Sequence, residues 1–383
     1  MLASFFKNIR KPQYPTLNRI EISADNLSVN FNYLRSIQPE AEIIPVLKSN
    51  AYGHGLAQVC RVLDRLGAKM LAVDSFPEAQ IAYHNFSGKV LILGEMPKEA
   101  YRYANFRRSE FCVYNKHTLD SLARYGKRAK VHLFVNSGMN REGIKDIASF
   151  LKKNKASLDQ VSISGLCSHL ADSEVDGSKL TKRQLDNFFS ALSILNENGF
   201  HPSLIHLGNS GGIFTLKDSR LTAFRAGLAF YGYNPFSTSH PQHGAASNLR
   251  PALRLITKVV SVQDLDKGDA VSYNGRYLSG GQEYSAVVPC GYYEGLSRDL
   301  SNKAYFFDIK RGRYLPIAGS VCMNLCCLAT GKEKMNIGDE VELISWEKEK
   351  ENSVDNLSKI SKKIVYETLV SLRDNIRREV IWH

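Results

Sequence analysis

The 383-residue sequence predicts a parallel (β/α)8 barrel, a TIM-like barrel, followed by a mostly β domain. In the first part of the chain, short apolar runs alternate with amphipathic stretches, and eight such units over about 200 residues are typical of a barrel. After a polar connection at residues 236–251, apolar runs separated by turns predominate. We therefore expect a leader at residues 1–18, a barrel at 19–245 and a β domain at 246–383.

Strands of the barrel are expected where short apolar runs end in polar or glycine-containing turns. Between them, residues 26–37 and 180–197 carry apolar side chains at helical spacing, which indicates amphipathic helices. An open, doubly wound sheet is the alternative, but it would normally show fewer units and a glycine-rich first turn. The eight expected strands are residues 43–47, 70–74, 89–94, 110–114, 130–135, 161–168, 204–208 and 221–224.

The last third of the chain is expected to be mostly β, because turns such as Asp-Lys-Gly-Asp at 266–269 separate its apolar runs. A single helix is expected at residues 354–372, followed by a last strand at 379–382. The other strands expected in this domain are residues 252–262, 284–289, 304–309, 314–328 and 340–346.

Composition argues against several classes of protein. The net charge is +12, but basic and acidic residues are interspersed and no aromatic RNA-binding signature accompanies them, so no nucleic-acid partner is expected. No apolar run approaches the roughly 20 residues of a membrane span, and no membrane partner is expected. The seven cysteines are odd in number and irregularly spaced, which favours free thiols in the cytoplasm over disulfides or a metal site.

The most informative residue is Lys48, which follows the apolar run 43–47 and precedes Ser-Asn-Ala-Tyr-Gly-His-Gly. Barrel enzymes carry their sites at the carboxyl ends of the strands, where this lysine is expected. Burial can keep an amine partly neutral and nucleophilic, so that it can form a Schiff base with an aldehyde cofactor. A lysine that merely ends a strand is the structural alternative.

Two later segments have the composition of a ligand site. Residues 206–212, His-Leu-Gly-Asn-Ser-Gly-Gly, form a glycine-rich turn after the seventh expected strand, where backbone N–H groups can bind an anion such as phosphate. Arg225 lies within the apolar run 224–232, where a charged side chain is costly unless it is paired. An arginine whose head group reaches the rim of the barrel is the alternative.

These segments resemble the signatures of the alanine racemase family. The residues around Lys48, including Tyr52 and His54, resemble its pyridoxal-phosphate motif, and the Asn-Ser turn and the Arg-x-Gly-x-x-x-Tyr-Gly pattern from Arg225 match as well. The resemblance implies a pyridoxal 5′-phosphate cofactor bound to Lys48, with Arg225 donating to its pyridine nitrogen. A guanidinium keeps its proton, so the ring is a weaker electron sink and side reactions such as transamination are disfavoured. By the same resemblance, the phosphate is bound by Tyr52, Ser210, Gly227, Leu228 and Tyr366.

Inversion of a stereocentre needs proton carriers on both faces of the reacting carbon. Lys48 supplies one, and by resemblance to the family Tyr273 supplies the other, helped by a histidine linked to Arg225, which matches His169. In the family, the β domain of one subunit completes the barrel site of the other, so the resemblance implies a homodimer with shared active sites. It also implies that the amino-acid substrate is contacted by Arg141, Tyr292 and Met323.

The chain departs from the family at three positions. Phe134 stands where many members have a lysine carried as a carbamate that pairs with the arginine matched by Arg141. Asn136 and Asn324 each replace an acid. Because a phenyl ring cannot carry a negative charge, we expect either a bound anion or an altered network at Arg141.

The function expected from the sequence is interconversion of L- and D-alanine by a two-base mechanism of Lys48 and Tyr273. A racemase for serine or a broader set of amino acids is the nearest alternative. A decarboxylase on the same two-domain plan is less favoured, because the motif beside Lys48 differs from the decarboxylase pattern. A weakly active or non-enzymatic relative that binds pyridoxal phosphate is the alternative from another class, motivated by Phe134, Asn136 and Asn324.

Overall fold

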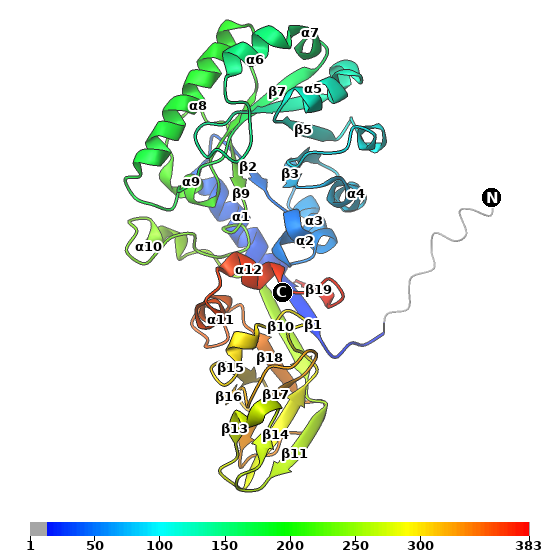
Figure 1. The fold of residues 1–383 in the computed structure, drawn as a ribbon, viewed down its shortest axis with the longest axis vertical. Helices are drawn as coiled ribbons and strands as arrows, with labels where there is room; N and C mark the ends of the chain where they lie inside the picture. The colour runs from blue at the N-terminus through cyan, green and yellow to red at the C-terminus, as the bar shows by residue number, and fades with distance from the viewer. Residues whose placement is uncertain (1–13, 383) are drawn as a thin grey trace, which may run out of the picture.

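The computed structural model describes residues 14–382, so residues 1–13 of the expected leader lie outside the described residues. It consists of a barrel and a mostly β part below it in the view of Figure 1. The expected fold class is thereby confirmed, whereas the exact boundary expected between residues 245 and 246 stays a prediction.

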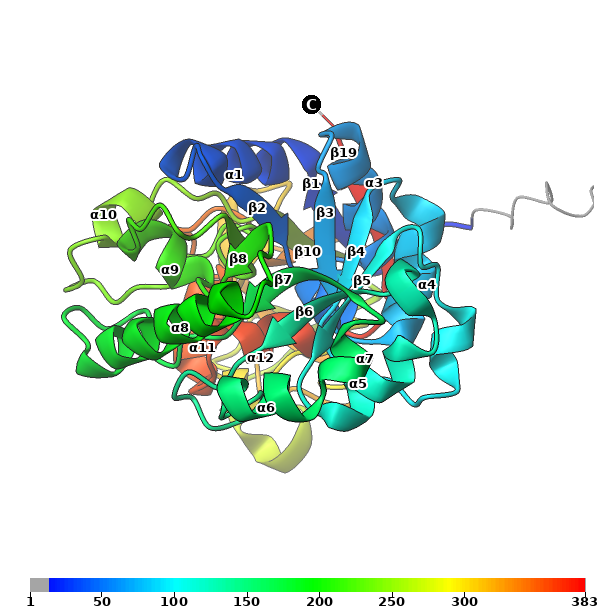
Figure 2. The same ribbon diagram turned by 90° about the horizontal axis from the view of Figure 1, so that it is seen from above.

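Eight parallel strands form the barrel, with the helices around them (Figure 2). The first and last strands pair with each other, Glu42 opposite Ala223, and a bridge from Val46 to Ala72 joins the first strand to the second. The seventh and eighth are joined where Arg225 N donates to Gly208 O at 3.0 Å. The strands are β2 Glu42–Pro45, β3 Met70–Val73, β4 Lys89–Ile92, β5 Ser109–Val113, β6 Lys130–Phe134, β7 Ser162–Cys167, β8 Leu204–His206 and β9 Ala223–Ala226.

The helices begin where the sequence offers capping side chains. Ser23 accepts from Asn26 N at the start of α1, and Ser178 accepts from Thr181 N at the start of α8. Both helices were expected from their apolar spacing. The helical segments of the barrel are α1 Ala24–Ile37, α2 Lys48–Tyr52, α3 Leu56–Arg65, α4 Phe76–Asn85, η2 Ala100–Tyr103, α5 Lys116–Ala123, η3 Gly126–Arg128, α6 Ile147–Lys153, α7 Lys155–Leu158, α8 Lys179–Glu197, α9 Ser210–Thr215 and α10 His243–Ala246.

The β part contains a six-stranded sheet in the order β16-β15-β18-β10-β1-β19 and a three-stranded sheet in the order β11-β14-β17. Its strand β1, Arg19–Ser23, precedes the barrel in the chain but pairs with β10 and β19. The beginning of the described chain is therefore tied to the part that follows the barrel. The other segments are β10 Leu253–Lys258, β11 Ser261–Leu265, β12 Ala270–Val271, η4 Tyr273–Gly275, β13 Tyr277–Leu278, β14 Glu283–Val288, η5 Arg298–Leu300, β15 Tyr305–Asp308, β16 Arg313–Pro316, β17 Cys326–Gly331, β18 Glu340–Ile344, α11 Val354–Ser361, α12 Val365–Val370 and β19 Arg377–Ile381.

Three expected segments in the β part are divided. The run 252–262 gives β10 and β11, and the run 314–328 gives β16 and β17, because the chain changes sheets between them. The helix expected at 354–372 is two helices. Lys362 ends the first in a left-handed conformation with φ 54°, and Glu367 accepts from Ile364 N at 3.1 Å to start the second.

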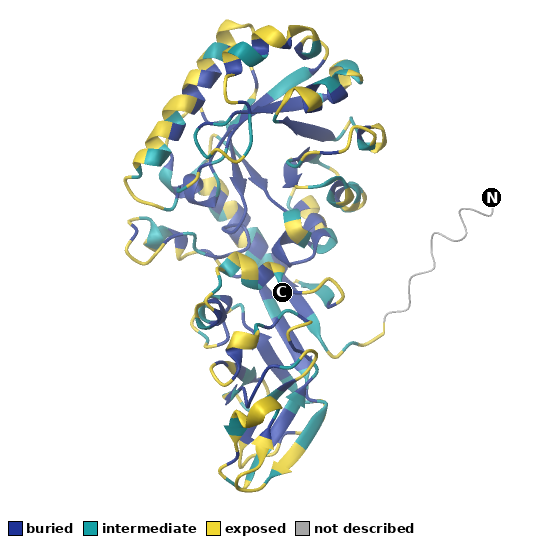
Figure 3. Ribbon diagram, in the orientation of Figure 1, coloured by how far each residue is buried: buried dark blue, intermediate teal, exposed yellow. Residues whose placement is uncertain are grey.

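Burial follows the architecture (Figure 3). The barrel strands are buried, whereas the outer helices have exposed outward faces. One cluster of buried apolar side chains extends from the barrel into the β part, from Leu71 of β3 to Leu253 of β10. None of the helices within residues 14–382 is both long and apolar enough to cross a membrane.

Candidate active site

A cavity of about 710 Å³ lies at the carboxyl ends of the barrel strands, where barrel enzymes carry their sites. Its wall comes from the loops after the strands and from α12. Tyr273, Tyr292 and Met323 do not line it. Nine of the expected site residues do: Lys48, Tyr52, Arg141, His169, Ser210, Arg225, Gly227, Leu228 and Tyr366.

Lys48 is half-buried and opens a turn that the sequence did not predict. Ser49 to Tyr52 all have φ between 52° and 56°, so α2 is one turn of left-handed helix. This conformation costs about 1–2 kcal/mol per residue for L-amino acids, and such strain is often found at functional sites. The turn returns the chain so that the phenol of Tyr52 reaches the same cavity as the amine of Lys48.

Contacts from distant segments hold the left-handed turn. Ser49 N donates to Glu78 Oε1 at 2.7 Å, and Asn50 Nδ2 donates to Asp374 Oδ1 at 2.6 Å. A Cβ at Gly53 would lie 2.2 Å from the carbonyl oxygen of Leu369, so only glycine allows this approach. The strain of the turn is therefore offset by contacts with both the barrel and α12.

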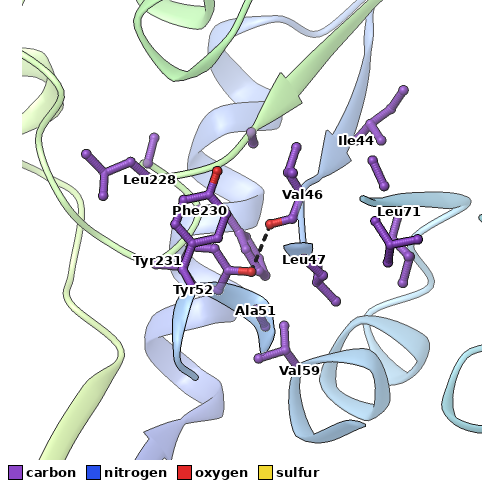
Figure 4. Close-up of a cluster of buried hydrophobic side chains, with 14 of the residues drawn as sticks. Ile44, Val46, Leu47, Ala51, Tyr52, Val59, Leu71, Leu228, Phe230 and Tyr231 are labelled. Atoms are coloured by element: carbon purple, nitrogen blue, oxygen red, sulfur yellow. Dashed lines mark hydrogen bonds between the residues drawn. The ribbon is translucent and has the colours of Figure 1, made fainter. Parts of the chain in front are cut away.

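Tyr52 is fixed within a cluster of aromatic rings (Figure 4). Its ring centroid lies 5.0 Å from that of Tyr231, whose hydroxyl donates to Val46 O at 2.9 Å, and 5.9 Å from that of Tyr366. Burial, followed by the effects of Tyr366 and Asp74, raises the pKa of Tyr52, so its phenol stays protonated and can donate a hydrogen bond.

His54 supports the same turn. Its Nδ1 lies 2.9 Å from Tyr52 O, and its ring packs 4.4 Å from that of Tyr231. Burial lowers the pKa of His54 to about 3, so its imidazole is neutral at ordinary pH.

Ser210 and Gly227 leave a space beside Tyr52 that could hold an anion, which we call the anion cradle. Ser210 Oγ accepts from Ala229 N at 3.1 Å, which leaves the hydroxyl hydrogen for another acceptor. A Cβ at Gly227 would lie 2.7 Å from the hydroxyl oxygen of Tyr52. The two hydroxyl groups thus meet at a place that only a glycine leaves open.

Arg225 extends from β9 into the cavity and is 5% exposed. Its Nη2 donates to Ser168 O at 2.5 Å and lies 3.2 Å from His169 Nδ1, and its Nη1 lies 2.5 Å from His206 Nδ1. Burial and the charge of Arg225 lower the pKa of both histidines, that of His169 to about 3. Both imidazoles are therefore neutral and can accept from the guanidinium.

Arg141 has an acidic partner that the sequence analysis missed. Its Nε and Nη2 donate to the two carboxylate oxygens of Glu142 at 2.5 and 2.6 Å, and both residues line the cavity. Phe134 is 6% exposed and packs 4.8 Å from Tyr114 between ring centroids. The pair of Arg141 with Glu142 is an altered network, one of the two outcomes expected at this arginine. An acid directly after the arginine was the available signal.

The two asparagines also have local partners. Asn136 Oδ1 accepts from the backbone N–H groups of Gly138 and Asn140, both at 3.1 Å, so it closes the loop that carries Arg141. Asn324 Nδ2 donates to Glu294 Oε1 at 2.9 Å in the β part.

Comparison with known proteins decides the family. Two family models match the chain, the N-terminal domain of alanine racemase over residues 22–235 and its C-terminal domain over residues 252–380. The chain belongs to the alanine racemase family. An alanine racemase of Clostridium perfringens is 33% identical over 366 residues, which cover 94% of this chain and 94% of that protein.

Solved structures of alanine racemases have the same fold. The enzyme from Streptomyces lavendulae superposes with a TM-score of 0.87 at 26% identity, over 96% of this chain and 98% of that chain. The alanine racemase from Bacillus anthracis with bound L-Ala-P gives a TM-score of 0.86 at 27% identity, over 97% and 96% of the two chains.

The remaining residues suggested by the alanine racemase resemblance gather on one exposed surface of the β part. Tyr273, Tyr292 and Met323 are 66%, 43% and 56% exposed. Tyr292 N donates to Cys322 O at 3.0 Å, and Ser320 Oγ donates to Tyr273 O at 3.4 Å. We call Tyr273, Tyr292 and Met323 the β-part cluster. It is separate from the cavity of its own chain.

Proposed function

We propose that this protein is a pyridoxal 5′-phosphate-dependent racemase that interconverts L- and D-alanine, with Lys48 and the Tyr273 of a second copy as proton carriers. The observation that carries the proposal is the gathering of Lys48, Arg225 and the anion cradle around one cavity. Membership of the alanine racemase family supports the choice of reaction.

The residues around the cavity fit this cofactor. The glycine at 227 leaves room for a phosphate beside two hydroxyl groups, and the buried guanidinium of Arg225 suits a ring nitrogen that accepts a hydrogen bond. Lys48 would hold the aldehyde carbon. When bound, the cofactor withdraws electrons from the substrate Cα and makes its hydrogen acidic. Its phosphate would be held by Tyr52, Ser210, Tyr366 and the backbone at Gly227 and Leu228.

Arg225 keeps its proton throughout, because a guanidinium is not deprotonated in proteins. His169 and His206 are neutral and accept from it, so the guanidinium stays oriented without a second cation beside it. Arg141 would bind the carboxylate of the amino acid. Its bidentate pairing with Glu142 would fix the direction of the guanidinium.

In the proposal, the second proton carrier is Tyr273 from the β part of a second copy. The amine of Lys48 would remove or return a proton on one face of the substrate Cα, and the phenol of Tyr273 on the other. The exposed β-part cluster supports this assignment, since a homodimer in which each β part covers the partner's barrel would bury it.

Isotope exchange tests the reaction. Holoprotein incubated with L-alanine in deuterated water should produce D-alanine with deuterium at Cα, and Lys48→Ala should abolish both. Cofactor binding without any exchange would contradict the proposal and favour a non-enzymatic relative.

A broader amino-acid specificity is the second candidate. Three carboxylates line the cavity, those of Asp74, Glu142 and Glu174, and carboxylates suit a side chain that donates hydrogen bonds. Turnover across a panel of L-amino acids decides between the two. Faster turnover of serine or of a basic amino acid than of alanine would favour this candidate.

A further inference from the structure

A line of buried polar side chains runs through the barrel interior beneath Arg225. His206 of β8 lies between Arg225 and His132 of β6, with its Nδ1 2.5 Å from Arg225 Nη1 and its Nε2 2.7 Å from His132 Nδ1. His132 Nε2 lies 2.9 Å from Glu110 Oε2 of β5. Glu110 is 4% exposed, and both histidines are 0% exposed. Four strands of the barrel thus contribute one side chain each to a continuous chain of hydrogen bonds.

The positions of the protons in this line of hydrogen bonds follow from Arg225 at its end. A guanidinium only donates, so His206 Nδ1 must accept. Neutral His206 then carries its hydrogen on Nε2 and donates to His132 Nδ1. Because His132 Nδ1 accepts from His206, the hydrogen of His132 lies on Nε2, from which it donates to the carboxylate of Glu110. Each nitrogen has one partner, and the direction of every hydrogen bond is the same.

The barrel is shaped to hold this chain. A Cβ at Gly165 of β7 would lie 2.2 Å from His132 Nδ1, so a glycine there makes room for the ring. The β6–β7 register shifts between Val131 and His132. Ser164 Oγ donates to Glu110 Oε2 at 2.7 Å, and Lys130 Nζ lies 4.0 Å from its other oxygen. Burial raises the pKa of Glu110, but hydrogen bonds from His132 and Ser164 and the charge of Lys130 oppose this effect and keep the pKa below its ordinary value, so the carboxylate is ionised.

We propose that Glu110 is a positioning residue, which fixes the guanidinium of Arg225 through His132 and His206 and provides its buried counter-charge. This inference rests on the proposed function, in which Arg225 meets the pyridine nitrogen of the cofactor. A buried arginine is costly without a negative partner, and Glu110 supplies that charge through two neutral imidazoles that transmit hydrogen-bond direction. The carboxylate never touches substrate or cofactor.

Nitrogen NMR of the wild-type holoprotein with ¹⁵N-labelled histidine tests the chain directly. Both His132 and His206 should be neutral, with hydrogen on Nε2 and none on Nδ1. Assignment comes from His132→Gln and His206→Gln spectra. A hydrogen on Nδ1 of either ring would overturn the proposal. Because this readout needs no turnover, correct tautomers in a protein that does not racemise alanine would refute the proposed function alone.

Kinetics of Glu110→Gln provide the second test. Its kcat should fall about 10- to 100-fold, which is the usual loss when a residue that orients a site residue through hydrogen bonds is removed. The KM for alanine should change less than about twofold. Glu110→Asp, which keeps the charge, should recover part of the loss. Glu342→Gln removes a carboxylate of similar burial in β18 and should leave kcat unchanged. An unchanged kcat in folded Glu110→Gln would contradict the role of Glu110.

Discussion

At the scale of single residues, Glu142 supplies a negative charge beside Arg141, which Phe134 cannot do. Phe134 packs against Tyr114 instead, and the acid that pairs with Arg141 is the residue next to it. The sequence predicted that some change was needed at Arg141. Glu142, which directly follows Arg141, was the available signal, but whether the two side chains pair depends on the loop closed by Asn136.

Glu142→Gln should weaken substrate binding, since Arg141 loses its ionic partner and its fixed direction. Both side chains are partly exposed, so the loss is at most about 1 kcal/mol, or about a fivefold rise in KM for alanine. Steady-state kinetics measure it. Asp218→Asn is the matched control, because Asp218 forms the same bidentate pair with Arg220 away from the cavity. An equal effect in both variants would contradict the role given to Glu142.

Gly227→Ala should reduce affinity for the cofactor. The added methyl group would lie 2.7 Å from the hydroxyl oxygen of Tyr52 and fill the anion cradle. Overpacking of about 1–3 kcal/mol corresponds to a Kd for pyridoxal 5′-phosphate raised about 5- to 150-fold, measured by titration of the apoprotein. Gly244→Ala, where a Cβ meets nothing within 4 Å, should leave this Kd unchanged. Wild-type affinity in Gly227→Ala would place the phosphate elsewhere.

At the scale of elements, the regular strands and helices were predictable from the sequence, whereas the strained left-handed turn was not. The barrel strands and helices α1 and α8 follow from local apolar spacing. The left-handed turn from Ser49 to Tyr52 does not, because only Asn50 among these residues tolerates positive φ readily. The turn is held by Glu78 and Asp374, which are remote in sequence, so the residues around Ser49 alone could not predict it.

Ser49→Gly should stabilise the protein. Ser49 is exposed with φ 56°, so glycine removes a strain of about 1–2 kcal/mol and adds an entropic cost of about 0.5–1 kcal/mol. The free energy of unfolding in urea should therefore rise, by at most about 1.5 kcal/mol. Ser36→Gly, at an exposed position in right-handed α1, should instead lower it. A decrease in both variants would argue against a strained turn.

At the scale of the whole molecule, buried histidines should make stability depend on pH. The pKa of His54 and of His169 is about 3 in the folded protein, and that of His206 is also well below its ordinary value. The unfolded chain binds these protons near pH 6.5, so stability is fully present above that pH and is lost as pH falls toward about 3. Each histidine contributes a slope of about 1.4 kcal/mol per pH unit.

Urea unfolding at several pH values and one protein concentration measures this slope. The exposed His84 is the control, since His84→Gln should leave it unchanged. A free energy of unfolding that stays flat between pH 7 and pH 5 would show that the buried imidazoles take up protons without unfolding.

The proposed active site joins residues of two chains. The resemblance to the alanine racemase family pointed to nine site residues that line one cavity. The β-part cluster is exposed in the single chain. In the proposed homodimer, the barrel of a second copy would cover it. The central claim is therefore that Lys48 and Tyr273 act together across two subunits.

Mixing two inactive variants tests that claim most directly. Lys48→Ala and Tyr273→Phe should each fail to racemise alanine, and after subunit exchange their heterodimers should contain one intact site and one doubly altered site. Racemisation should then return to about a quarter of the wild-type rate, because about half of the dimers are mixed and each has one working site of two. If the mixture stays inactive although heterodimers form, the two residues do not share a site across the interface.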